Sequence, residues 1–302
     1  MDSRALEGAK QDTQAGRMDE VNIVQIHQQR VASLAVKLNE GLPQCWAGID
    51  VHVAGQVHQA DARPPLIHAD MQSHAGIIRS NQALPIVVSA LIVFSGQFCM
   101  TGSRLLVHES VADRVRTGLG AWLRAVKVGP AADPVGEMGP IIDKPNVERI
   151  DKIVEDAIAQ GATVIVRGGP VADGPLAAGA CYRPALLEVR DPSLPIVKDE
   201  VFGPVLTMQT FATEAEAVAL ANDSQYGLSA SVFSRDVDLP LRVALALESG
   251  SVWVNDWARL HDQFEEGGFK ASGLGRMRGF AVMDDFVEFK HIRLRPGPTP
   301  AA

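Results

Sequence analysis

A cysteine with the surroundings of a nucleophile, Cys99, follows a strongly apolar run and lies among small residues. The segment from Phe94 to Arg104 reads FSGQFCMTGSR. Small neighbours leave room for a carbonyl carbon to approach sulfur, and nearby backbone N–H groups can lower the pKa of the thiol and hold a developing oxyanion. An isolated cysteine is otherwise a buried, inert side chain. The segment therefore predicts either a nucleophile or a structural cysteine.

A second group of chemically capable residues precedes Cys99. It contains four histidines and three aspartates: His52, His58, His68, His74, Asp50, Asp61 and Asp70. Imidazole and carboxylate groups bind metals, but these spacings match no ligand pattern. We therefore expect solvated loop histidines and no metal site.

Composition restricts the partners of this chain. It has 302 residues, 46% of them hydrophobic, and a net charge of −8 without a basic block. Such a chain buries a large core, and its charge argues against nucleic acid or an anionic membrane as the partner. The longest apolar run, from Leu84 to Phe94, is too short to span a bilayer.

The cysteines indicate a reducing compartment. Cys45, Cys99 and Cys181 are odd in number and far apart, which does not fit a disulfide framework. The polar N-terminus lacks the apolar region of a signal peptide. We expect a cytoplasmic protein.

The elements that must position Cys99 are predicted from periodicity. A helical stripe covers Val21 to Leu42 and ends at Gly41 and Pro43. A buried strand is expected over 104–108, further strands over 163–166, 185–189, 205–211, 228–233 and 251–255, and a half-exposed strand over 284–291. Helices are expected over 111–126, 146–159, 214–221 and 239–247. This alternation predicts an α/β domain with a mostly parallel, covered sheet.

Five segments, in this order, resemble the aldehyde dehydrogenase superfamily. They read SGQFCMTGSRLLV, KDEVFGPVL, NDSQYGLSASVFS, GSVWVND and EEGGFKASGLGR. The resemblance runs from about residue 64 to 292. It implies a catalytic domain over 64–276 and an oligomerisation strand with a tail over 277–302. Residues 1–63 form an unmatched segment, which the apolar periodicity predicts to be partly helical.

The resemblance implies a role for individual residues. Cys99 would be the nucleophile, with its own backbone N–H as half of an oxyanion hole. Glu200 and Phe202 would position the nicotinamide end of NAD or NADP; without the resemblance, Glu200 reads as a surface carboxylate beside Lys198. The pocket residues would be Trp257, Phe264 and Glu266, although the two aromatic residues equally suit core packing. An acid at Glu266 would favour a cationic or polar aldehyde.

The chain departs from the family pattern before Cys99. Relatives carry there a dinucleotide-binding domain, an oxyanion-hole Asn beside a Pro-Trp-Asn motif, and a Glu-Leu-Gly-Gly-Lys motif whose Glu activates water. The corresponding stretch here reads VHVAGQVHQADARPP and has no glutamate. Loss of one oxyanion donor costs about 2.7–4 kcal/mol, and loss of the base costs about 10²–10⁴-fold in rate. We therefore expect an activity impaired by truncation.

The resemblance implies NAD(P)-dependent oxidation of an aldehyde to a carboxylic acid through a Cys99 thioester. A non-catalytic assembly subunit and a cofactor-independent cysteine esterase are the alternatives. The expected partners are a small aldehyde and further subunits, in a homo-oligomer or a mixed oligomer.

Overall fold

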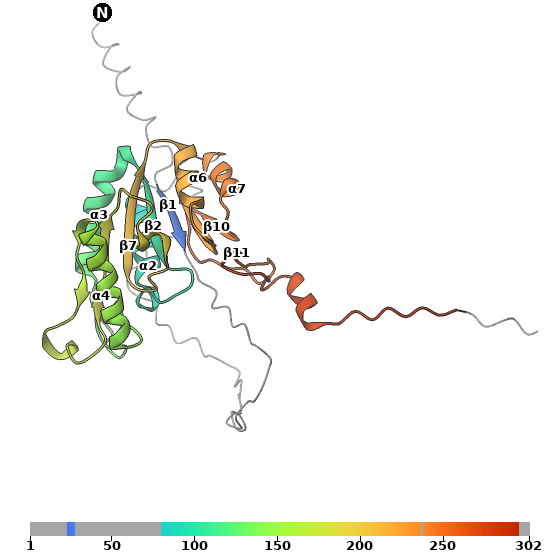
Figure 1. The fold of residues 1–302 in the computed structure, drawn as a ribbon, viewed down its shortest axis with the longest axis horizontal. Coiled ribbons are helices and arrows are strands. Elements are labelled where there is room, and N and C mark those ends of the chain that lie inside the picture. The colour runs from blue at the N-terminus through green and yellow to red at the C-terminus, as the bar shows by residue number, and fades with distance from the viewer. Residues whose placement is uncertain (1–22, 28–79, 237, 296–302) are drawn as a thin grey trace, which may run out of the picture. The chain divides into compact units, whose positions relative to one another are not determined.

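A seven-stranded sheet forms the centre of the molecule (Figure 1). The computed structural model describes residues 23–27, 80–236 and 238–295, which belong to one compact unit. The strand order is β10-β9-β1-β2-β7-β6-β3. The strands are β1 (Ile23–His27), β2 (Gly102–His108), β3 (Thr163–Val166), β6 (Ala185–Glu188), β7 (Val205–Phe211), β9 (Ser229–Phe233) and β10 (Ser251–Val254). Two further pairs of short strands are β4 (Gly169–Pro170) with β5 (Tyr182–Arg183), and β8 (Tyr226–Gly227) with β11 (Phe269–Lys270).

The sheet is mostly parallel, as the sequence predicts. β2, β6, β7, β9 and β10 share one direction, whereas β1 is antiparallel to both β2 and β9, and β3 is antiparallel to β6. In the parallel pair β2–β7, Leu105 lies opposite Met208. Since parallel neighbours begin at the same edge, the loops entering β2 and β7 come together there.

Helices cover both faces of this sheet. They are α2 (Ser80–Ile92), α3 (Ala112–Ala125), α4 (Lys144–Ala159), α5 (Pro195–Lys198), α6 (Glu214–Asn222) and α7 (Asp238–Ala246). In β2, Leu105 and Val107 pack in the cluster with α2 and α3, whereas Leu106 packs with α6 and α7. All three side chains are fully buried. The continuous apolar run of β2 is therefore explained by burial on both faces.

The boundaries of α4 follow from local chemistry. Asp143 is its N-cap, and its carboxylate accepts a hydrogen bond of 2.8 Å from the backbone N–H of Asn146. Val147, Ile150 and Val154 form its buried stripe. Gly161, with φ +98°, lies just beyond its end, in a conformation that side chains rarely adopt.

Two sequence predictions are wrong. Residues 23–27 form a strand and not part of a helix, because their hydrogen bonds to β2 on one side and to β9 on the other outweigh the local helical pattern. The rest of the predicted helix lies outside the described residues. The predicted strand over 284–291 is absent: a 3₁₀ helix covers Ala281–Phe286, and irregular chain follows. No strand in the described part of the chain pairs with this segment, so its alternating pattern has no sheet to join.

None of the helices within the described ranges combines the length and apolar character needed to cross a membrane.

Candidate active site

Cys99 lies in a tight turn that enters β2. The backbone N–H of Thr101 donates to the carbonyl of Phe98 over 2.9 Å, so Cys99 and Met100 occupy the centre of the turn. The Cys99 thiol is free and half-buried. Cys99 is therefore not a fully buried cysteine, and its role as a nucleophile stays a prediction.

Hydrogen bonds fix the loop that carries Cys99. The Ser95 hydroxyl donates to the carbonyl of Gly139 over 2.9 Å. The Gln97 amide oxygen accepts from the backbone N–H of Ile142 over 2.9 Å. These contacts connect the loop to the segment that leads into α4.

The backbone just before Cys99 is strained. Phe94, Ser95 and Gly96 are three successive left-handed residues, with φ of 47°, 60° and 72°. For a residue with a side chain this conformation costs about 1–2 kcal/mol. The Phe94 side chain, moreover, is 70% exposed. Strain of this kind persists where the surrounding structure imposes it, and it concentrates at functional sites.

Gly96 brings this loop against the turn before β7. A Cβ on Gly96 would lie 2.4 Å from the carbonyl carbon of Gly203 and 2.5 Å from the nitrogen of Pro204. No real side chain tolerates such contacts with backbone atoms. Only glycine at position 96 therefore allows the Cys99 loop to approach the turn that carries Glu200 and Phe202.

That second turn rests on α4. Arg149 donates from Nη2 to the carbonyl of Val201 over 2.9 Å. Phe202 has a left-handed backbone, with φ 50°, and its side chain is 40% exposed. Glu200 is half-buried, with Oε1 shielded from solvent.

Glu200 is half-buried, so it is not the fully exposed surface carboxylate of the alternative interpretation. The ammonium of its neighbour Lys198 pairs with Asp223 over 2.6 Å. Glu200 acts electrostatically on the thiol of Cys99. The structure therefore brings Glu200, Phe202 and Cys99 to one edge of the sheet.

The environment of Cys99 favours the neutral thiol. Burial is the largest effect and raises the pKa of the Cys99 thiol, and the carboxylates of Glu266 and Glu200 raise it further. The backbone N–H groups of Met100 and Cys99 act in the opposite direction and lower the pKa. The expected stabilisation by backbone N–H groups is present, but burial outweighs it.

Trp257 joins the Cys99 turn from a distant part of the sequence. Its Nε1 donates to the carbonyl of Met100 over 2.9 Å. Its ring meets Phe98 edge-on at a centroid distance of 6.2 Å, and Phe98 meets Phe94 at 5.5 Å. Left-handed conformations at Asn255 and Ala258 redirect the chain on either side of Trp257. A short row of aromatic rings therefore lies beside the thiol.

Glu266 is a largely buried carboxylate in the loop that follows. Its side chain is 12% exposed, and its Oε1 accepts a hydrogen bond of 2.8 Å from Nε of Arg278. Its neighbour Glu265 is exposed and accepts hydrogen bonds from the backbone N–H groups of Phe280 and Ala281, at 3.0 and 3.2 Å. The two adjacent acids thus differ: Glu265 caps a 3₁₀ helix, and Glu266 belongs to the surroundings of Cys99.

Phe264 is exposed, and its role in the pocket stays a prediction. Its side chain is 68% exposed, which excludes the core-packing alternative, and its ring contacts His261 at 6.3 Å. Arg278, in contrast, has a clear contact with Glu266 that no sequence signal indicated. The two residues lie twelve positions apart in an irregular loop, and only its fold brings them together.

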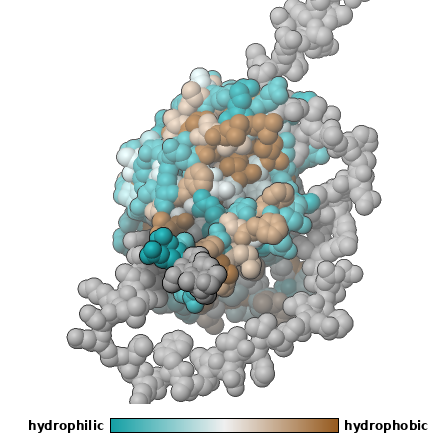
Figure 2. Space-filling view, turned by 90° about the vertical axis from the view of Figure 1, so that its right-hand side faces the viewer, coloured by the Kyte–Doolittle hydropathy of each residue, from teal (hydrophilic) through white to brown (hydrophobic). Residues whose placement is uncertain are grey.

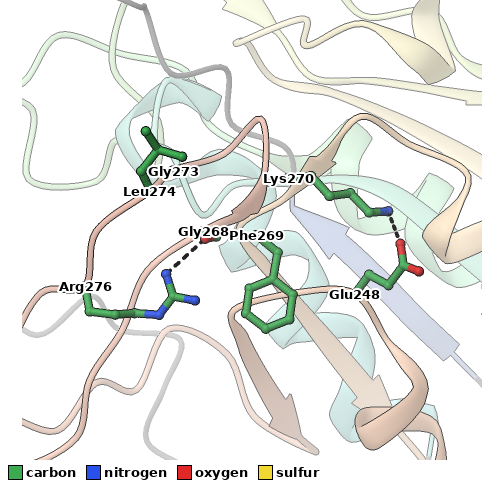
Figure 3. A pocket seen from close by; sticks show the side chains of 7 residues that line it. All are labelled: Glu248, Gly268, Phe269, Lys270, Gly273, Leu274 and Arg276. Carbon is green, nitrogen blue, oxygen red and sulfur yellow. Dashed lines mark hydrogen bonds and ion pairs between the residues drawn. The ribbon is translucent and has the colours of Figure 1, made fainter.

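An open hollow lies beside the glycine-rich segment over 267–276 (Figure 3). Its volume is about 420 Å³. Lys270 crosses it to Glu248 over 2.5 Å, and Arg276 donates to the carbonyl of Gly268 over 3.2 Å. Arg276 also lies over the ring of Phe269, 5.4 Å from its centroid. Lys270 and Glu248 are thus paired with each other, whereas Arg276 contacts a backbone carbonyl and an aromatic ring.

The described residues contain no cluster of three or more histidine, cysteine or acidic side chains able to hold a metal. The histidine-rich stretch before Cys99 lies outside these residues. The turn at Glu200 and Phe202 fits the nicotinamide end of a dinucleotide: it offers a shielded carboxylate oxygen, which acts on the thiol, and a partly exposed aromatic ring.

The chain is similar in sequence to known proteins. The family described as "Aldehyde dehydrogenase family" matches residues 77–292. A betaine aldehyde dehydrogenase from Bacillus subtilis is 36% identical over 210 residues, which cover 70% of this chain and 43% of that enzyme. A chloroplastic aminoaldehyde dehydrogenase from Arabidopsis thaliana is 37% identical over 206 residues, which cover 68% of this chain and 41% of that enzyme.

Solved structures of the same kind of enzyme match the fold of this chain. A crystal structure of betaine aldehyde dehydrogenase from Staphylococcus aureus in complex with NAD+ matches with a TM-score of 0.68 and 38% identity. The match covers 70% of this chain and 42% of that chain. This chain spans less than half the length of these relatives.

Proposed function

The chain belongs to the aldehyde dehydrogenase family, and from that premise we propose that it oxidises an aldehyde to a carboxylic acid, with Cys99 as the nucleophile and NAD or NADP as the cofactor. One observation carries the proposal: the half-buried Cys99 thiol lies in a strained loop that Gly96 holds against the turn of Glu200 and Phe202. Nucleophile and cofactor-positioning residues thereby share one site.

The chain's own residues have separate tasks in this scheme. The Cys99 thiol first gives its proton to water; Sγ of the thiolate then adds to the aldehyde carbon, and the N–H of Cys99 donates to the oxygen that becomes negative. Glu200 would accept hydrogen bonds from the ribose hydroxyls of the cofactor, and Phe202 would pack beside the nicotinamide. The bound NAD(P) supplies the hydride acceptor. Water then releases the acid from sulfur.

The aldehyde binds beside Trp257 and Glu266. Relatives of this chain are a betaine aldehyde dehydrogenase and an aminoaldehyde dehydrogenase, and a carboxylate in the pocket suits a cationic substrate. Arg278 compensates part of this charge. Kinetics of Glu266→Ala decide the point: a larger loss for amino aldehydes than for aliphatic aldehydes supports the preference, and equal losses remove it.

The test of the activity uses the full chain with NAD or NADP and a panel of aldehydes. Formation of the reduced cofactor, followed by its absorbance, is expected for the wild type and not for Cys99→Ser. Cofactor binding is measured separately by calorimetry. Absence of both binding and turnover would favour the assembly subunit. Ester hydrolysis that depends on Cys99, without any aldehyde oxidation, would favour the cysteine esterase.

The C-terminal segment is the proposed contact with further subunits. Phe286, Phe289, Ile292 and Leu294 are 79–88% exposed and follow one another closely. Contiguous exposed apolar residues mark interaction sites. Light scattering after gel filtration is expected to show an oligomer, and Phe289→Ser with Ile292→Ser is expected to reduce its mass.

We also infer a reducing, cytoplasmic location from the three cysteines. Fractionation of expressing cells tests it.

A further inference from the structure

Glu266 carries an oxygen that is set up to receive a proton. Its Oε1 is held by Arg278 over 2.8 Å, but its Oε2 is buried and has no hydrogen-bond partner in the described part of the chain. Leaving a buried acceptor without a donor costs about 1–3 kcal/mol, and more for a charged group. A water molecule or a substrate group at Oε2 removes that cost.

The direction of this side chain is imposed by its surroundings. The backbone N–H of Glu266 donates to the carbonyl of Met277 over 2.8 Å, and Met277 returns a hydrogen bond of 2.7 Å. The next residue, Gly267, is packed so closely that a Cβ there would lie 2.6 Å from the carbonyl oxygen of Gly275. With the backbone fixed on both sides and Oε1 held by Arg278, Oε2 has little freedom to turn outward.

The carboxylate also belongs to the surroundings of the thiol. Glu266 and Glu200 are the two acids that act electrostatically on Cys99. The same loop touches the Cys99 turn directly, because Trp257 donates to the carbonyl of Met100 over 2.9 Å. Glu200 already has a task at the cofactor in the proposed function, and Glu265 points its carboxylate at backbone N–H groups instead.

We propose that Glu266 is the general base that activates the water molecule which releases an acyl group from Cys99. The proposal rests on the proposed function only in taking Cys99 as the nucleophile. Water oxygen bonds to the acyl carbon while Oε2 takes a proton from it. The carbon–sulfur bond then breaks, sulfur leaves as thiolate and recovers the proton from Glu266, and a free carboxylic acid departs. No oxidant or reductant takes part in this step.

The step can therefore be isolated with p-nitrophenyl acetate and no cofactor. Acylation of Cys99 releases nitrophenolate in a burst, and the later steady rate reports hydrolysis of the thioester. Glu266→Gln keeps an oxygen that Arg278 can bind, and it is expected to retain the burst while its steady rate falls by about 10²–10⁴-fold. Mass spectrometry should find acetyl-Cys99 accumulating in this variant.

Two controls separate chemistry from folding. Glu265→Gln changes the adjacent acid in the same loop and should keep the wild-type steady rate. Hydroxylamine cleaves thioesters without a base and should restore turnover of Glu266→Gln, which a misfolded site could not show. The size of the burst counts folded sites directly.

The outcomes are distinguishable. A normal burst with a steady rate equal to that of the wild type overturns the role of Glu266 and leaves Cys99 as the nucleophile. A burst lost in Glu266→Gln also overturns it, since the defect would then lie before hydrolysis. Absence of both nitrophenolate release and acetyl-Cys99 in the wild type, the latter followed by mass spectrometry, overturns the nucleophilic role of Cys99 and this inference with it.

Discussion

Replacing Gly96 by alanine should destabilise the protein through a contact that joins the two halves of the site. Gly96 has φ +72°, and an added Cβ would meet the backbone of Gly203 at 2.4 Å. The left-handed conformation costs about 1–2 kcal/mol for alanine, and forcing extra atoms into a packed region costs about 1–3 kcal/mol more. The free energy of unfolding should therefore fall by about 2–5 kcal/mol.

Gly174→Ala is the matched control. Gly174 has φ +68°, but nothing lies within 4 Å of its hypothetical Cβ. This variant pays the conformational cost alone, about 1–2 kcal/mol. The difference between the two variants consequently isolates the contact between the Cys99 loop and the turn before β7.

Urea denaturation followed by far-UV circular dichroism measures both losses. Labelling of Cys99 by iodoacetamide in the folded protein provides a second readout, since a displaced loop should expose sulfur and label faster in Gly96→Ala but not in Gly174→Ala. Equal losses of stability in the two variants would refute the reasoning, because the close approach of Gly96 and Gly203 would then have no energetic weight.

Three further predictions concern Cys99, Arg104 and Trp257. Burial raises the pKa of the Cys99 thiol, so the thiolate fraction and the alkylation rate should still increase with pH above the ordinary thiol value of about 8.5; a plateau reached below that pH contradicts this. Burial lowers the pKa of Arg104 to about 10, and among the described residues only its Nη2 has a partner, the carbonyl of Leu220. Arg104→Met should therefore leave the free energy of unfolding within about 1 kcal/mol of the wild type or raise it, whereas Arg104→Ala should lower it by about 2–5 kcal/mol by leaving a cavity. Equal losses of the two variants in urea denaturation would disprove this. Trp257→Phe removes one hydrogen bond beside Cys99, so it should lower the free energy of unfolding by about 0.5–1.5 kcal/mol and speed alkylation of the thiol. The control Trp253→Phe removes a comparable hydrogen bond of 2.8 Å to another carbonyl and should not alter the alkylation rate. Equal alkylation rates in the two variants would count against the anchoring role of Trp257.

Local pattern was sufficient for most of the fold. The helices at 112–125 and 144–159 and the strands at 102–108 and 205–211 follow from apolar period and caps. Each of these elements buries residues that its own period places on one side, or on both sides for the central strands. The small residues next to Cys99 in the chain likewise indicated a cysteine nucleophile from the sequence alone.

Tertiary contacts decided the rest. Strand β1 exists because β2 and β9 leave hydrogen-bonding edges on either side of it, and a local helical pattern cannot report that. The segment 284–291 alternates apolar and polar residues like a strand. It forms none, because no strand among the described residues lies beside it to accept its hydrogen bonds.

The site shows the same division. Sequence determined that Cys99, Glu200 and Glu266 are present, because residue types and their motifs are local properties of the chain. Only the folded structure decided that Gly96 meets Gly203, that Arg278 holds Glu266, and that burial raises the pKa of the Cys99 thiol. Contact and desolvation depend on atoms distant in sequence, whose positions are set by packing.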